Sequence, residues 1–251
     1  MTENYFLTRK SCRKFKPETI DSELLDEILF QAAKAPTCGN MQLYSVVVTK
    51  DKNLLNKLVP FHYNQPAAST APIILTICAD FNRFSKWCEI NNADQAYNNF
   101  HSFIMAMTDA VIFSQQIVTI AENKGLGTCY LGTVTYNASE ISKLLDLPDL
   151  VIPVASIAIG VPECEGESTD RIPIEGFVHL EKYKKQNELD LKNVFKIHEG
   201  NPQSEKFIKE NNKENLAQVF SEIRYPRETN EKISRSFLKL LKDKGFSGGL
   251  F

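Results

Sequence analysis

The sequence predicts a layered α/β or α+β fold in which helices pack on a central β-sheet. Three observations favour this class. Apolar runs typical of buried strands stand at 44–49 (YSVVVT), 73–79 (IILTICA) and 151–161 (VIPVASIAIGV). Segments with apolar residues at helical spacing stand between these runs. The chain has 251 residues, of which 43% are hydrophobic, so it is long enough to bury a core on such a sheet.

The first half of the chain begins with a helix and a strand. Residues 22–35 carry leucine and isoleucine at helical spacing, Asp21 or Ser22 can cap the start, and Pro36 ends the helix. The segment 36–42 (PTCGNMQ) is a loop by its composition. The elements that follow are a strand, a short helix and a second strand, at 44–49, 53–58 and 73–79.

The second half begins with a long helix at 101–123. Its apolar residues lie on all sides, which predicts burial on more than one side. Gly125-Leu126-Gly127 then turns the chain. The remaining core elements are a strand, a loop, a helix and a last strand, at 128–131, 132–133, 138–145 and 151–161.

We divide the chain into a core at 1–180 and a C-terminal arm at 181–251 that extends the same domain. Residues 183–232 are rich in Lys, Glu, Asn and Gln and hold few apolar anchors, which predicts an extended or helical arm. Residues 234–244 predict a short amphipathic helix at its end.

Composition excludes several classes of protein. The net charge of -2 provides no field that would recruit nucleic acid or an anionic membrane. No apolar run approaches the roughly 18 residues of a membrane span, and the N-terminus does not resemble a secretory signal. The six cysteines are scattered without C-x-x-C spacing, so we expect reduced thiols, a cytoplasmic protein and no metal site.

The segment 9–14 (RKSCRK) places four cations and a hydroxyl within six residues. Arg9, Ser11 and Arg13 alternate with other residues, so they can project toward one anion. Arginine offers a planar fork of donors and serine a short hydroxyl, which together suit a phosphate. A solvated basic edge is the alternative interpretation.

Two common nucleotide sites do not fit the sequence. The glycines of G-L-G at 125–127 precede a strand instead of opening a helix, which argues against a dinucleotide-binding fingerprint. The chain also has no G-x-x-x-x-G-K-[ST] run. The basic cluster and two loops rich in small residues, 36–40 and 131–133, would suit a flat cofactor with one phosphate, such as flavin mononucleotide (FMN).

Five motifs together resemble the nitroreductase superfamily of FMN-dependent NAD(P)H oxidoreductases. They are R-x-S-x-R-x-F at 9–15, A-P-T-C-G-N-M-Q at 35–42, A-D-F-N-R at 79–83, G-L-G-T-C-Y-L-G-T at 125–133, and G-V-P followed by R-I-P at 160–173. The C-terminal arm resembles the oxygen-insensitive major nitroreductase and flavin reductase branch. The resemblance implies an α+β three-layer fold with a central mixed, mostly antiparallel sheet and an arm that wraps a dimer partner.

The resemblance also implies how the flavin phosphate is bound. Arg9, Lys10 and Ser11 would lie near the phosphate, and Arg13 near the N1–O2 side of the ring. Arg171 would add a further cation at the phosphate. Relatives often place another cation two residues before that position, where this chain has Thr169, and an NADPH-binding arginine at the position of Thr135.

The remaining implied contacts lie around the ring. Gln65 would pair with the pyrimidine edge, and the amide of Gly132 would lie near flavin N5, with Leu131 and Thr133 beside it. The loop after the first helix would cover the flavin of the partner subunit, and its residues are Pro36, Thr37, Cys38 and Asn40. No side chain is implied to be catalytic, because the flavin carries the redox chemistry.

The function that this implies is ping-pong hydride transfer from NAD(P)H to a nitroaromatic, quinone or flavin-type acceptor, by a homodimer with shared active sites. A dedicated flavin reductase is one alternative. A flavin-binding or flavin-storage protein without turnover is another. A nucleic-acid binder that uses the basic cluster is the weakest, because the net charge and the lack of an aromatic-basic pattern argue against it.

Overall fold

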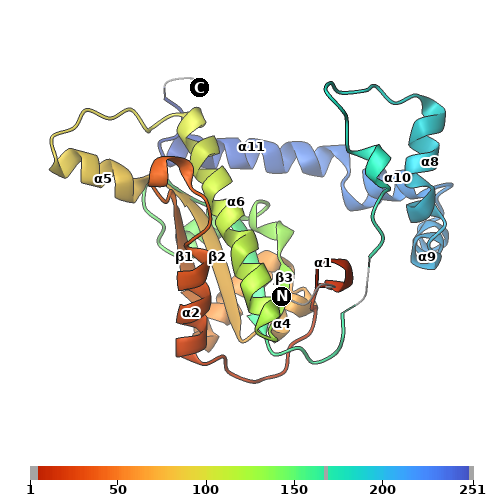
Figure 1. The fold of residues 1–251 in the computed structure, drawn as a ribbon, viewed down its shortest axis with the longest axis horizontal. Helices are drawn as coiled ribbons and strands as arrows, with labels where there is room; N and C mark the ends of the chain where they lie inside the picture. The colour runs from red at the N-terminus through yellow and green to blue at the C-terminus, as the bar shows by residue number, and fades with distance from the viewer. Residues whose placement is uncertain (1–4, 167–168, 249–251) are drawn as a thin grey trace. The chain divides into compact units, whose positions relative to one another are not determined.

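A four-stranded sheet in the order β1-β2-β4-β3 forms the centre of the fold (Figure 1). The structure is a computed structural model and describes residues 5–166 and 169–248. The three predicted core strands form at nearly the expected residues, and the bounds of the strands are β1 (Tyr44–Thr49), β2 (Ile73–Asp80), β3 (Gly127–Tyr130) and β4 (Val151–Gly160). The sheet was expected to be mixed and mostly antiparallel, and all pairings between the described strands are antiparallel.

Helices precede, separate and follow these strands. In the N-terminal part they are α1 (Tyr5–Thr8), α2 (Ser22–Ala32), α3 (Lys52–Leu58), α4 (Pro66–Thr70), α5 (Asn82–Ile90), α6 (Phe100–Asn123) and α7 (Ala138–Leu144). In the C-terminal part they are α8 (Glu188–Glu199), α9 (Pro202–Glu210), α10 (Leu216–Gln218) and α11 (Arg227–Asp243). Single helical turns lie at Cys38–Asn40, Val59–His62, Gly132–Val134, Ile174–Gly176 and, as a π-helical turn, Val219–Arg224.

The sheet is the middle of three layers, because its buried residues alternate between two faces. Ile73, Leu75 and Ile77 of β2 pack in one apolar cluster with α2 and α6. Ile74, on the opposite face of the same strand, packs in a second cluster with α3, α4 and α7. This arrangement confirms the predicted α+β three-layer fold. In Figure 1, α2 and α6 are seen to lie along the sheet.

Helix α6 is the core helix of the molecule. Its buried face packs on β2, β4 and β1 and on α2, whereas Ile104, Val111 and Ile112 stay partly exposed. The prediction of burial on more than one side therefore holds for the faces that meet the sheet, α2 and the C-terminal residues Leu240 and Leu241. Among the described helices, α6 alone is long and apolar enough to cross a membrane. The buried core helix of a globular protein can have the same length and composition.

The chain forms two compact units. Unit 1 comprises Met1–Glu167 and Ile233–Phe251, and unit 2 comprises Ser168–Lys232. Unit 2 holds α8, α9 and α10, so the segment predicted as an extended or helical arm is helical over much of its length. The division at residue 180 into core and arm stays a prediction.

Local signals explain where several helices begin. The side chain of Asp21 accepts a hydrogen bond from the amide of Glu23, which confirms the predicted cap of α2. Asn187 and Asp190 form a capping box at α8. Helix α11 begins at Arg227, several residues before the predicted start at 234. Helix α5 was not predicted, because its few apolar residues gave a weak helical pattern.

Gly127 allows the N-terminal segment to lie against β3. A Cβ atom at this position would stand 2.6 Å from Cys12 Cβ and 2.7 Å from its Sγ. Replacing Gly127 with Ala is therefore expected to lower the free energy of unfolding by about 1–2 kcal/mol, through overpacking. Gly132→Ala is the matched control for stability, because a Cβ there meets no atom within 4 Å. Denaturant unfolding of both variants measures this, and equal stabilities would contradict it.

Candidate functional site

The basic N-terminal segment runs beside strand β3. The amide of Cys12 donates a hydrogen bond to the carbonyl of Thr128 at 2.9 Å, and the Cys12 side chain is buried. Ser11 and Arg13 flank Cys12 in the sequence, and neither is buried as Cys12 is. Arg13 is exposed and Ser11 is half-buried. That Ser11 and Arg13 project toward one anion stays a prediction.

Arg9 is held by a carboxylate at the end of α6. Its Nε lies 3.1 Å from Oε2 of Glu122, a side chain that is only 9% exposed. Glu122 also accepts a hydrogen bond from the hydroxyl of Tyr5 at 2.7 Å. Burial, and next the bond to Glu122, raise the pKa of Tyr5 to about 12. The ion pair holds the guanidinium group of Arg9 through Nε.

Arg9 and Arg13 converge on β3. Burial raises the pKa of the Cys129 thiol, and the positive charges of Arg13 and Arg9 both oppose this rise. Arg9 likewise opposes the rise that burial causes in the pKa of Tyr130. The two guanidinium groups therefore lie near the strand that leads directly into Leu131-Gly132-Thr133.

The loop at Leu131–Thr133 is joined to the segment that carries Gln65. Nδ1 of His62 lies 2.9 Å from Oγ1 of Thr133, and the side-chain amide of Asn137 donates to the carbonyl of Phe61 at 2.7 Å. Gln65 follows at the N-cap position of α4, where its side chain makes no capping bond. One apolar cluster contains parts of all three segments, including Cys12, Ala67 and Leu131. The structure thus brings the N-terminal cluster, Gln65 and the Gly132 loop into one region of unit 1.

His62 is a buried, neutral histidine. Its side chain is fully buried, and burial lowers its pKa to about 4. Its Nε2 has no hydrogen-bond partner among the described residues. The ring therefore serves as a fixed support for Thr133.

The loop Pro36–Gln42 lies at a different place along α6. Asp109 on this helix accepts hydrogen bonds from the loop, whereas Glu122, thirteen residues later, holds Arg9. At 1.5 Å per residue the two positions are roughly 20 Å apart along the helix axis. Cys38 and Asn40 are exposed and face solvent in this chain. Within one chain, then, the loop stands apart from the Arg9–Gly132 region.

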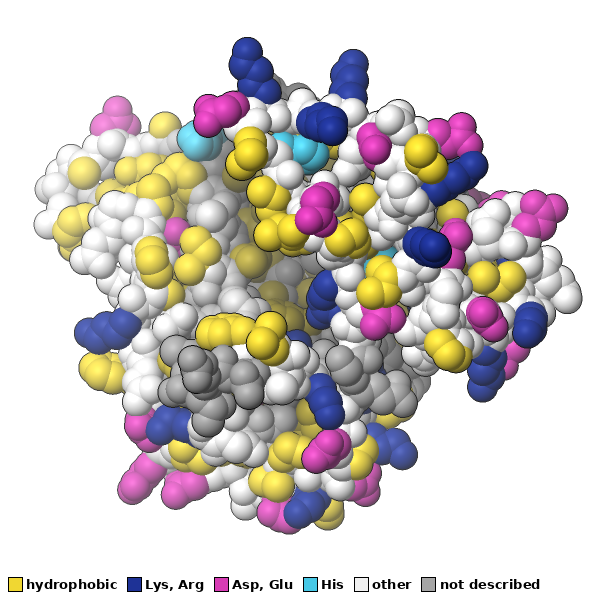
Figure 2. Space-filling model, turned by 45° about the vertical axis from the view of Figure 1, so that its right-hand side comes forward, with side chains coloured by type: hydrophobic (Ala, Val, Ile, Leu, Met, Phe, Trp, Pro, Cys, Tyr) yellow, Lys and Arg dark blue, Asp and Glu magenta, His cyan; other side chains and the backbone are white. Residues whose placement is uncertain are grey.

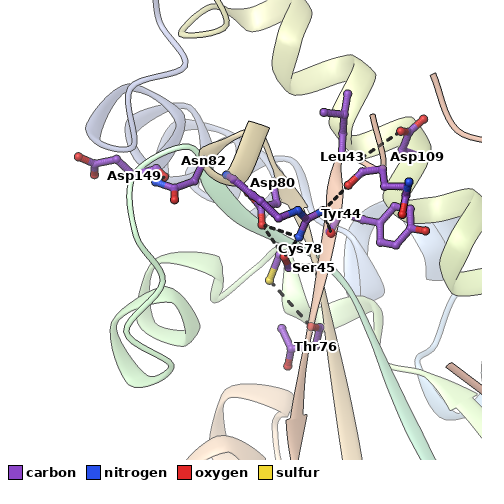
Figure 3. Close-up of polar contacts among 11 residues, drawn as sticks. Leu43, Tyr44, Ser45, Thr76, Cys78, Asp80, Asn82, Asp109 and Asp149 are labelled. Atoms are coloured by element: carbon purple, nitrogen blue, oxygen red, sulfur yellow. Dashed lines mark hydrogen bonds and ion pairs between the residues drawn. The ribbon is translucent and has the colours of Figure 1, made fainter. Parts of the chain in front are cut away.

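Arg83 binds the C-terminal end of the loop, where the loop leads into β1. Its Nη2 donates to the carbonyl oxygens of Gln42, at 2.5 Å, and Tyr44, at 3.1 Å. Its Nη1 donates to Oγ of Ser45 at 3.2 Å and lies 3.7 Å from the Asp80 carboxylate. Figure 3 shows this network around Tyr44, Ser45 and Asp80, with Asp109 reaching Leu43 from α6.

Two of the predicted phosphate cations have other contacts. Arg171 belongs to unit 2, where its Nη1 donates to Oγ1 of Thr169 at 2.6 Å and to the carbonyl of Asp170 at 3.0 Å. Lys10 forms an exposed ion pair with Glu165 at 3.3 Å, a kind of pair that contributes little stability. The roles of Arg171 and Lys10 stay predictions.

Sequence reasoning missed Asp109, Glu122 and His62. The partners of each stand far away in the sequence. An acidic residue on the apolar face of the 101–123 helix was the one available signal.

Among the described residues no group of His, Cys, Asp and Glu suits a metal ion. On the face in Figure 2, Lys and Arg intermix with Asp and Glu.

The Arg9–Gly132 region fits FMN by two observations. Arg9 and Arg13, with Ser11 between them in the sequence, belong to the segment that runs beside β3 at one end, and these residue types suit a phosphate or an electron-rich ring edge. At the other end Gly132 is exposed, and the space where its Cβ would stand is open to 4 Å. A flat ring can therefore approach the backbone of Gly132 without a steric clash.

Comparisons with known proteins identify relatives of this chain. The model of the nitroreductase family matches residues 7–161. An FMN reductase [NAD(P)H] from Bacillus subtilis is 33% identical over 72% of this chain and 73% of its own length. An oxygen-insensitive NADPH nitroreductase from Salmonella typhimurium is 27% identical over 71% of this chain and 73% of its own. The crystal structure of an oxidoreductase from Bacteroides fragilis has a TM-score of 0.95 and 42% identity, covering 97% of this chain and 99% of that one.

Proposed function

Because this chain belongs to the nitroreductase family, we propose that it transfers hydride from NAD(P)H, through bound FMN, to small organic acceptors. It is an FMN-dependent NAD(P)H oxidoreductase of the flavin reductase and nitroreductase branch. The observation that supports the site assignment is that the N-terminal segment runs beside the strand that leads into Gly132, with the amide of Cys12 bonded to Thr128 and Arg9 paired with Glu122.

The N-terminal segment would hold the polar end of the cofactor. Arg9, fixed at Nε by Glu122, would donate to the phosphate together with Ser11 and Lys10. Arg13 would stand near the N1–O2 side and stabilise negative charge that develops there. Arg171 of unit 2 would add a further cation. Bound FMN would supply the hydride-transfer chemistry, so no acid–base pair of side chains would be required.

The loops would hold the ring. Gln65 would pair with the pyrimidine edge, and the Gly132 amide would donate toward N5 between Leu131 and Thr133. His62 contacts Thr133, so it keeps the Gly132 loop in place. NAD(P)H would bind first and leave, and a nitroaromatic, quinone or free flavin would then bind at the same face of the flavin ring, which is a ping-pong mechanism. The names of the relatives favour a dedicated flavin reductase as the second candidate.

Anaerobic rapid mixing of the FMN-loaded protein with NADH or NADPH tests this proposal. We expect full bleaching of the flavin absorbance by at least one donor, followed by reoxidation by an acceptor from the nitroaromatic, quinone or flavin classes. Rates across that panel separate a general reductase from a flavin reductase. Bound FMN that neither donor reduces would identify a flavin-storage protein and refute the proposal.

We propose further that the protein is a cytoplasmic homodimer. Ile104, Val111 and Ile112 of α6 and Phe30 of α2 are exposed apolar side chains of unit 1, which supports a buried contact there. The loop Pro36–Asn40 would cover the partner's flavin, and the arm at 181–251 would wrap the partner. Light scattering should give a mass of twice 28.4 kDa. A monomer with full FMN binding and activity would contradict the shared site.

A further inference from the structure

We propose that Asp109 is a positioning residue that sets the shape of the loop 37–43 and so determines how firmly FMN is held. The inference rests on the proposed function, in which this loop covers the flavin. Asp109 touches no cofactor in this scheme, and it acts only through the loop.

One carboxylate ties both ends of the loop. Oδ1 of Asp109 accepts from the amide of Cys38 at 3.0 Å, and Oδ2 accepts from the amide of Leu43 at 3.3 Å and from the hydroxyl of Thr37. Oγ1 of Thr37 in turn accepts from the amide of Gln42 at 2.9 Å. Figure 3 shows the carboxylate of Asp109 directed from α6 toward Leu43. The chain is thereby closed on itself between Thr37 and Leu43.

The loop needs such a restraint because its backbone is unusual. Gly39, Asn40 and Gln42 have φ angles of 54°, 57° and 54°, in the left-handed region. For residues other than glycine this region is unfavourable and persists only where surrounding contacts impose it. Asp109 is 2% exposed, so its charge is buried and is compensated by these donors. The loop and the carboxylate therefore stabilise each other.

Both carboxyl oxygens of Asp109 are needed as acceptors, and a side chain of the same size is insufficient. Asparagine has the same shape but only one acceptor oxygen, whereas Cys38 and Leu43 donate to different oxygens of Asp109. In Asp109→Asn one backbone N–H would face the NH₂ group and lose its partner. The exposed tip at Cys38–Asn40 would then sample other conformations, and its cover over the flavin would loosen.

The experiment measures the Kd for FMN and the visible circular dichroism of the bound flavin in full-length Asp109→Asn and Thr37→Val, singly and together. We expect each single variant to raise the Kd about tenfold, and the double variant to raise it no further, because residues in one hydrogen-bonded network are not additive. The dichroism band should change in all three. Val118→Ala is the matched control, since Val118 is equally buried on α6 but belongs only to the apolar cluster.

The control separates positioning from loss of stability. Val118→Ala should lower the Tm yet keep the Kd and the dichroism of the wild type well below that Tm. The inference would be overturned if Asp109→Asn bound FMN with the affinity of the wild type, or if the effects on the Kd were additive in the double variant. It would also be overturned if Val118→Ala raised the Kd for FMN as much as Asp109→Asn does. Failure of the wild type to bind FMN would refute the proposed function instead, so the two failures are distinguishable.

Discussion

Replacing Arg13 with Ala is expected to raise the Kd for FMN by about 10- to 100-fold, which corresponds to the loss of hydrogen bonds to a charged group. Arg13 is exposed, follows the buried Cys12, and lies close enough to β3 to act on the Cys129 thiol. It would hold the electron-rich side of the ring. Because its charge favours the reduced, more negative ring, its removal should also shift the flavin potential to a more negative value.

Lys14→Ala is the matched control for Arg13→Ala. Both residues are exposed cations of the same cluster. The contact that Lys14 makes with Glu163 is a backbone one, in which the carbonyl of Lys14 accepts a hydrogen bond from the amide of Glu163 at 3.1 Å. The Lys14 side chain can therefore be removed with little effect on the Kd or the potential. Fluorescence titration with FMN measures both variants. Equal losses would show that the cluster acts as diffuse charge.

Removing His62 is expected to make the protein less sensitive to acid. The folded-state pKa is about 4, below the usual 6.5. As the pH falls below 6.5, the unfolded chain therefore binds a proton that the folded chain does not, and stability is lost until about pH 4. The difference amounts to roughly 3 kcal/mol over this window. Above pH 6.5 the group contributes no pH dependence.

The comparison is between His62→Gln and wild type in denaturant unfolding at fixed FMN between pH 7 and 4. The wild type should lose about 3 kcal/mol more than the variant over this range. His101→Gln, at an exposed position of α6, should follow the wild-type curve. If the free energies of unfolding of His62→Gln and wild type fell in parallel with pH, the folded protein would bind a proton at His62 as readily as the unfolded chain, which would contradict the lowered pKa.

Much of unit 1 was predictable because its signals are local. The apolar runs at 44–49, 73–79 and 151–161 coincide with β1, β2 and β4 to within one residue at each end. Pro36 and Asp21 marked the ends of the first helix to within a few residues. The alternation of side chains along a strand then places Ile74 and Leu75 on opposite faces of β2, and this alternation builds the three layers.

The supports of the site were not predictable, because each depends on a contact between distant residues. Asp109 meets Cys38 across 71 positions, and Thr133 meets His62 across 71. A single buried acid or histidine has no spacing from which its partner can be inferred. The same holds for Glu122, whose role appears only once the N-terminal segment is folded against β3.

The unit boundary shows another limit of the sequence. The change in composition after residue 181 predicted an arm, but the described fold returns to unit 1 at Ile233, so that Leu240 and Leu241 pack in the cluster of Phe103. A polar segment gives no sign of where its chain will rejoin a core.

The most direct test of the central claim, that the N-terminal cluster binds the flavin phosphate, is the Kd of FMN and of riboflavin for wild type and Arg9→Ala. Riboflavin has the same ring without the phosphate, so it reports any general damage from unpairing Glu122. We expect Arg9→Ala to weaken FMN binding about tenfold or more and to leave riboflavin binding unchanged. Equal weakening of both ligands, or unchanged FMN binding, would contradict the claim.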